Sequence, residues 1–211
     1  MYFRMLHDDA SGAVSYLLAD LAAGEAVLVD PRPADVPVLR AMLAEHRLQL
    51  RWTLCTHVHS HTYPHTQPTQ GGAGAAALAA LGAPAIVGHL PPQPLLDFGD
   101  EHVRVLPTPG HTAQCMSFRW RDRLFCGDLL GVDLCPHQPR PALPEALWDT
   151  VQGSVFSLPD ETLLFAAHAR AGRAASTVFE QRRWHPFFAG AGRDEFFARV
   201  AASPAPCLSD H

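Results

Sequence analysis

The chain has 211 residues, of which 47% are hydrophobic and 18% are charged, and its formal net charge is -5. This balance is typical of a globular protein with a substantial core, so it excludes a disordered chain and predicts one domain over residues 1–211. The 16 lysines and arginines form no continuous basic stripe, and no apolar run approaches the roughly 18 residues of a membrane span. We therefore expect neither a nucleic acid nor a membrane as a partner.

The cysteines and the N-terminal residues indicate the cellular compartment. The five cysteines are an odd number, and they show no CxxC or other disulfide-like spacing, which suits a reducing environment. The first residues contain neither the apolar core of a signal peptide nor a cleavage site. We expect free thiols and a cytoplasmic location.

The first part of the chain predicts strands around one helix. Two apolar runs, at 14–19 and 25–29, flank a short polar stretch and predict a hairpin. Asp35 is in position to cap a helix over 36–46, where apolar residues recur with a helical period. The β-branched and apolar segment 50–56 predicts a buried strand after that helix.

The second part predicts further strands, a long loop and helices toward the end. The expected strands lie at 84–87, 103–106, 116–120, 123–126 and 162–165, and the fourth forms a hairpin with the third. The expected helices lie at 73–81, at 145–156 and in pieces between 176 and 201, and a loop rich in proline and glycine spans 131–144.

Side chains of the metal-binding type follow four of these strands. They are His57, His111, Asp128 and His168. Strand ends at one edge of a sheet bring distant parts of the chain together, so we expect these side chains to converge. Two imidazoles and a carboxylate suit zinc or ferrous iron and leave coordination positions open, and the residues themselves leave both metals possible.

Four blocks of sequence resemble a known superfamily. The blocks at 54–59, 108–112, 125–128 and 158–168 are similar, in order and spacing, to those of the metallo-β-lactamase superfamily. Within it the chain looks most like the persulfide dioxygenases and next like the glyoxalase II thioesterases, and the likeness runs over roughly residues 2 to 200. The resemblance implies an α/β (α+β) fold, the four-layer αββα sandwich.

The resemblance also implies roles for individual residues. His57, His111 and Asp128 match the three ligands of the mononuclear iron at which persulfide dioxygenases oxidise a thiol persulfide to sulfite with O2. These are therefore the expected catalytic and metal-binding residues, with Fe(II) as the expected cofactor and Zn(II) as the alternative. His59, a further ligand in the hydrolytic branches, and His168 are each expected either to bind the metal or to hydrogen bond to its ligands.

The chain departs from the family pattern in ways that bear on function. His61 and Thr62 stand where binuclear hydrolases have the aspartate and the last histidine of the HxHxDH motif, which weakens a second metal site. His61 is a weaker candidate ligand, because an imidazole differs from a carboxylate in geometry and charge. Ala169 and Arg170 replace an Asp-Tyr pair beside the substrate.

Three functions remain open at this level. The first is an iron-dependent persulfide dioxygenase, the second a glyoxalase II-like thioester hydrolase, and the third a degenerate relative that binds without catalysing. The expected partner is a small-molecule thiol persulfide or thioester, and Arg170 and Arg173 are candidates to contact its negative charge. The resemblance also allows a homodimer.

Overall fold

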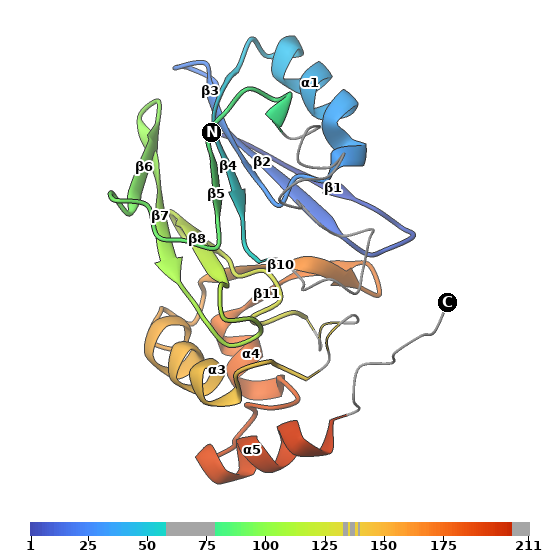
Figure 1. The fold of residues 1–211 in the computed structure, drawn as a ribbon, viewed down its shortest axis with the longest axis vertical. Helices are drawn as coiled ribbons and strands as arrows, with labels where there is room; N and C mark the ends of the chain where they lie inside the picture. The colour runs from blue at the N-terminus through green and yellow to red at the C-terminus, as the bar shows by residue number, and fades with distance from the viewer. Residues whose placement is uncertain (58–78, 133–134, 136–137, 139, 204–211) are drawn as a thin grey trace.

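The computed structural model describes residues 1–57, 79–132, 135, 138 and 140–203. Two β-sheets lie against each other in the middle of the molecule, with orders β1-β2-β3-β4-β5 and β11-β10-β9-β8-β7-β6. Helix α1 lies on the outer side of the first sheet, and α3, α4 and α5 lie beyond the second (Figure 1). The described part of the chain therefore has the four layers, helix, sheet, sheet and helices, that the sequence predicted.

The first sheet combines antiparallel and parallel pairs. Its strands are β1 (Tyr2–His7), β2 (Val14–Asp20), β3 (Glu25–Val29), β4 (Gln49–Cys55) and β5 (Ala85–Val87). The β1-β2 and β2-β3 pairs are antiparallel, while β4 runs parallel to both β3 and β5. Because β3 and β4 are parallel, the chain must cross over between them. The 3-10 turn η1 (Pro33–Asp35) and α1 (Val36–Glu45) form this crossover.

Strand β2 is buried along its whole length because both faces of the sheet are covered. Successive side chains of a strand point to opposite faces. Accordingly Tyr16 and Leu18 belong to the core between the two sheets, whereas Leu17 and Ala19 pack in the core beneath α1. A strand with two buried faces reads as a continuous apolar run, and this explains why it was recognisable in the sequence.

The second sheet is antiparallel except where β9 and β10 run parallel. Its strands are β6 (Leu95–Phe98), β7 (Glu101–Pro107), β8 (Met116–Trp120), β9 (Arg123–Phe125), β10 (Leu163–Arg170) and β11 (Arg173–Thr177). The outer layer consists of α3 (Pro144–Thr150), the π-helical turn η2 (Val151–Val155), α4 (Val178–Trp184) and α5 (Arg193–Ala202). A third apolar cluster, which includes Val151, Phe188 and Phe196, joins these helices to the sheet.

Most of the expected elements are confirmed, and three details are corrected. The Asp35 carboxylate makes no capping hydrogen bond; it accepts from Ser15 and pairs with Arg32 instead. Strand β10 extends to Arg170, so His168 lies within it rather than after it. Strands β1, β6 and β11 were not predicted, and most of the expected 73–81 helix lies outside the described residues.

Among the described residues, no helix combines the length and apolar character needed to cross a lipid bilayer.

Candidate metal centre

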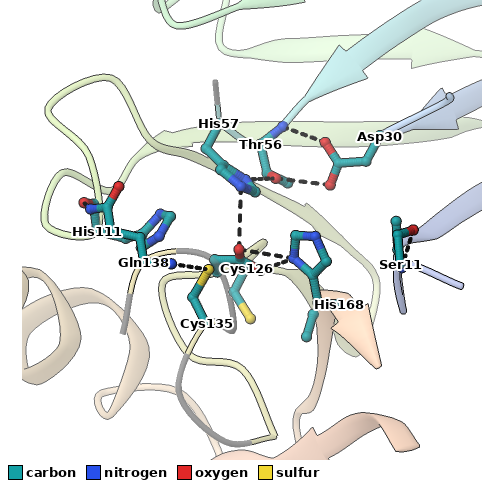
Figure 2. A network of polar contacts seen from close by, with 12 residues as sticks. Ser11, Asp30, Thr56, His57, His111, Cys126, Cys135, Gln138 and His168 are labelled. Atoms are coloured by element: carbon teal, nitrogen blue, oxygen red, sulfur yellow. Dashed lines mark hydrogen bonds and ion pairs between the residues drawn. The ribbon is translucent and has the colours of Figure 1, made fainter. Parts of the chain in front are cut away.

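A chain of hydrogen bonds orients His57 at the end of β4. Asp30, just after β3, accepts hydrogen bonds from the Thr56 backbone N–H at 2.7 Å and from the Thr56 hydroxyl at 2.8 Å. The same hydroxyl oxygen lies 2.9 Å from Nδ1 of His57. Figure 2 shows His57, Thr56 and Asp30 side by side in this chain of contacts. Because the hydroxyl has donated its only proton to Asp30, it accepts from the His57 Nδ1–H, which leaves the lone pair on Nε2.

Gly127 allows this arrangement to pack against the loop that follows β9. Its φ is +58°, and a Cβ at this position would lie 2.4 Å from Oγ1 and 2.6 Å from Cβ of Thr56. Only glycine combines that backbone conformation with so close an approach. The next residue, Asp128, is thereby brought to His57, with its Oδ2 3.4 Å from the Nε2 of the histidine.

Asp128 is held from its other side by His168. The Nδ1 of His168 lies 2.8 Å and 2.9 Å from the two carboxylate oxygens, and both side chains are buried. The strand that carries His168 is fixed at this point by Ala169, whose N–H donates to the Gly12 carbonyl at 2.7 Å. His168 therefore acts in this structure as a hydrogen-bond partner of Asp128.

His111 comes from the loop after β7, which packs directly on α3. A Cβ on Gly110, whose φ is +154°, would lie 2.5 Å from the Leu147 Cα. The backbone oxygen of His111 accepts from the Ala142 N–H at 3.0 Å and from Nε2 of Gln138 at 2.6 Å. The position of this histidine is thus set by contacts from α3 and from the loop that precedes it.

His57, His111 and Asp128 meet at one point, as the sequence predicted. Their ligand-type atoms all lie within 4.8 Å of one another. The two imidazole rings are 5.1 Å apart between centroids and nearly perpendicular. Two imidazole nitrogens and a carboxylate oxygen form a donor set that suits zinc or ferrous iron. The residues present therefore fit a bound metal ion.

The electrostatics of the site favour an ionised Asp128. Burial alone would raise the pKa of this carboxyl group, but the charges and hydrogen bonds of His168 and His57 hold the pKa well below its ordinary value. Burial raises the pKa of Asp30, and the charge of His57 and the hydrogen bonds from Thr56 only partly offset that effect. Asp128 therefore presents a negative charge to a cation.

Two cavities adjoin the metal-ligand candidates. One of about 20 Å³, enough for a water molecule, is lined by His111, Asp128 and His185 among others. The other has a volume of about 320 Å³ and is lined by Asp128, His168 and Arg170 together with the turn around Ser11. The larger one reaches the lower end of the size range of small-molecule sites.

The other candidate site residues that the sequence suggested differ in where they lie. Arg170 lines the larger cavity, whereas Arg173 does not line it and pairs with Glu180 on the surface. His59 and His61, together with Thr62, lie outside the described residues.

Three residues beside the site were missed or misjudged in the sequence. His185, for which no sequence pattern indicated a role, is buried and lines the smaller cavity, where its Nδ1 accepts from the Phe187 N–H. Gln138 and Cys135 lie in the loop after Asp128, and both line the smaller cavity. No sequence pattern identified them, because a proline-rich loop has no periodicity that predicts where its side chains point.

The chain is similar in sequence to two kinds of known enzyme. The chain is 28% identical over 189 residues to human mitochondrial persulfide dioxygenase ETHE1, covering 87% of this chain and 74% of that protein. It is 36% identical over 143 residues to a hydroxyacylglutathione hydrolase of Anaeromyxobacter dehalogenans, covering 61% of this chain and 51% of that enzyme. No protein-family profile matches.

Solved structures extend the likeness to the whole fold. The crystal structure of ETHE1 from Myxococcus xanthus superposes with a TM-score of 0.80 and 30% identity, covering 99% of this chain and 94% of that one. A metallo-β-lactamase from Staphylococcus aureus has a TM-score of 0.78 at 21% identity, covering 98% and 68%, and shows the shared fold.

The fold and the comparisons together define an enzyme of the metallo-β-lactamase superfamily, an oxidoreductase or a hydrolase. The 30% identity to the Myxococcus protein, over nearly the whole of both chains, identifies the family within this superfamily. The chain belongs to the family within that superfamily that contains ETHE1.

The Thr56 hydroxyl is expected to matter for metal binding although it is no ligand. Replacing Thr56 with valine keeps the shape but removes the link between Asp30 and His57. We expect metal affinity to fall about 10- to 100-fold, as is common when a hydrogen-bond partner of a ligand is lost, in a competition titration with a chelating dye.

Thr53, also on β4, offers a matched control. Its hydroxyl is buried and has no hydrogen-bond partner in the described part of the chain, so Thr53→Val should leave metal affinity unchanged. Equal metal affinity in the Thr56→Val and Thr53→Val proteins would show that the link does not orient His57.

Proposed function

We propose that the chain is a persulfide dioxygenase with a single ferrous ion held by His57, His111 and Asp128. The observation that carries this proposal is the convergence of two imidazoles and one carboxylate from three distant segments. The whole-length likeness to ETHE1 supports the reaction class. The resemblance that singled out these residues in the sequence also favours iron over zinc.

The reaction is the oxidation of the terminal sulfur of a thiol persulfide. One persulfide, one O2 and one water yield one thiol and one sulfite, with release of protons. A ferrous ion bound by His57, His111 and Asp128 would supply the redox chemistry with O2. The protein residues supply the geometry: Thr56 orients His57, His168 orients Asp128, and burial of the donors keeps bulk water away from them.

The larger cavity is the proposed substrate site. Its lining includes Asp128, His168 and Arg170, and its volume of about 320 Å³ suits a small thiol persulfide. Arg170 supplies a positive charge there for a substrate carboxylate. Arg173 lies away from this cavity, so we assign it no role in binding.

A thioester hydrolase is the second candidate, and a specific observation favours it. The hydroxyacylglutathione hydrolase relative is 36% identical over the part that aligns, a higher value than for human ETHE1. The same donors suit zinc, which lowers the pKa of a bound water to about 7. The two activities require different metals and different cosubstrates, so they can be separated by experiment.

The test is oxygen uptake by protein reconstituted with ferrous iron. With glutathione persulfide as substrate we expect O2 consumption and a matching amount of sulfite, both lost in His57→Ala and His111→Ala. His102→Ala, which alters an exposed histidine of β7, is the matched control and should keep full activity.

Iron-loaded protein that consumes no O2 with any persulfide would overturn the dioxygenase proposal. Hydrolysis of S-lactoylglutathione by zinc-loaded protein, lost in His57→Ala, would then establish the hydrolase. A cytoplasmic location, a single domain over residues 1–211 and a homodimer stay predictions.

A further inference from the structure

His185 is fixed in place just after α4, beside the smaller cavity. Its backbone oxygen accepts hydrogen bonds from the N–H groups of Phe188 and Ala189, at 3.1 Å and 3.0 Å. Its ring lies 5.7 Å from the Phe187 ring and 5.2 Å from the Phe188 ring, measured between centroids. The residue is only 5% exposed. Contacts therefore hold both the backbone and the imidazole of His185.

The hydrogen bond to the backbone decides which ring nitrogen of His185 carries the proton. The Phe187 N–H donates to Nδ1 of His185 at 3.1 Å, so Nδ1 carries no proton of its own. The proton of the neutral imidazole then lies on Nε2. Because Nδ1 is turned to the backbone, the Nε2–H is the polar group that this ring can offer to the cavity it lines.

The smaller cavity has the size and the polar lining of a site for one water molecule. Its volume of about 20 Å³ exceeds the roughly 10–15 Å³ that a water needs. Its described lining includes Asp128 and Gln138, whose side chains carry acceptor oxygens. The Nε2 of Gln138 donates to the His111 backbone oxygen, and Figure 2 shows these two residues side by side. A water here can accept from His185 and donate to these oxygens.

The smaller cavity adjoins the proposed substrate site. Three residues line both cavities, namely Asp128, Gly131 and Cys135. A water in the smaller cavity is therefore close to a persulfide in the larger one. The proposed reaction consumes one water for each persulfide, because O2 supplies two of the three oxygens of sulfite and water supplies the third.

We propose that the smaller cavity holds the water that the reaction consumes and that His185 positions this water through its Nε2–H. The inference rests on the proposed persulfide dioxygenase activity. The water oxygen bonds to the terminal sulfur after that sulfur has received the two atoms of O2. The S–S bond breaks and its electron pair leaves with the inner sulfur. One water proton goes to the thiolate so formed, and the other is released. His185 keeps its own proton throughout, so its part is to orient the water.

Two substitutions separate the Nε2–H donor from the rest of the His185 ring. In His185→Asn the side-chain oxygen can take the place of Nδ1 and accept from the Phe187 N–H, but nothing replaces the Nε2–H. In His185→Gln the longer amide reaches the place of Nε2 and can donate to the water. With iron-loaded protein and glutathione persulfide, we expect His185→Asn to lower kcat for O2 uptake about 10- to 100-fold. KM and iron content should stay near the wild-type values, and His185→Gln should recover most of the lost kcat.

A high-resolution crystal structure of the wild type tests the position of the water without an activity assay. An ordered water should lie about 2.7–3.2 Å from Nε2 of His185. A cavity without this water would overturn the inference, and so would a wild-type kcat in His185→Asn or equal losses of kcat in both variants. These outcomes leave the proposed activity standing. A wild type that consumes no O2 overturns the activity and this inference with it, so the two failures can be told apart.

Discussion

Asp128→Asn is expected to lower metal affinity by at least about 100-fold, because loss of even a hydrogen-bond partner of a ligand costs about 10- to 100-fold. The carboxylate lies 3.4 Å from His57 and within 2.9 Å of His168, so it contacts both histidines. Asparagine has nearly the same shape but carries no charge and has one acceptor oxygen instead of two. Metal content after dialysis, measured by elemental analysis, should fall close to background.

The control for charge removal alone is Asp97→Asn on β6. Asp97 is exposed and lines neither of the two cavities at the site, so its change should leave metal content at the wild-type level. Thermal unfolding of both variants checks that they fold. A folded Asp128→Asn protein with a full complement of tightly bound metal would contradict the assignment of Asp128 as a ligand.

Gly127→Ala is expected to destabilise the fold and the metal centre together. An L-residue in the left-handed region costs about 1–2 kcal/mol, and an added methyl group in a packed site costs about 1–3 kcal/mol more. The new Cβ would lie 2.4 Å from the Thr56 hydroxyl oxygen, which cannot move without releasing both Asp30 and His57. We expect the free energy of unfolding to fall by about 2–5 kcal/mol and metal affinity to fall with it.

Gly172→Ala separates backbone strain from the steric clash. Gly172 has a φ of +76° in the turn between β10 and β11, and a Cβ there would meet nothing within 4 Å. In this variant only backbone strain should lower the free energy of unfolding, by about 1–2 kcal/mol as measured by chemical denaturation. Its metal affinity should be unchanged. If Gly127→Ala is no less stable than Gly172→Ala and binds metal equally well, the close approach of Gly127 to Thr56 has no structural role.

The structure also explains why a site with so many buried polar groups is tolerated. The Asp30 carboxylate is buried but accepts two hydrogen bonds from Thr56, and Asp128 is paired with two histidines. Burial of a charge is costly unless it is hydrogen bonded or paired, and here each carboxylate has such partners. The hydrogen bonds and ion pairs that orient His57 and Asp128 therefore also offset the free-energy cost of burying the Asp30 and Asp128 carboxylates.

Some elements could be predicted from sequence because their signal is local. The hairpin of β2 and β3 has a continuous apolar pattern interrupted by a turn, and α1 has a helical period. Strands β1 and β11 escaped prediction because they are short and partly exposed, with charged residues among the apolar ones. Their strand state depends on pairing with β2 and β10, which the local sequence does not encode.

The sequence by itself indicated the superfamily, the layers that this resemblance implies and the convergence of His57, His111 and Asp128, because motifs and periodicity are properties of neighbouring residues. Only the tertiary structure decided that His168 pairs with Asp128, that Arg170 reaches the cavity while Arg173 does not, and that Cys135 joins the site. These outcomes depend on distances between segments far apart in the chain. Such distances are set by how the two sheets and the outer helices pack, which composition and spacing do not specify.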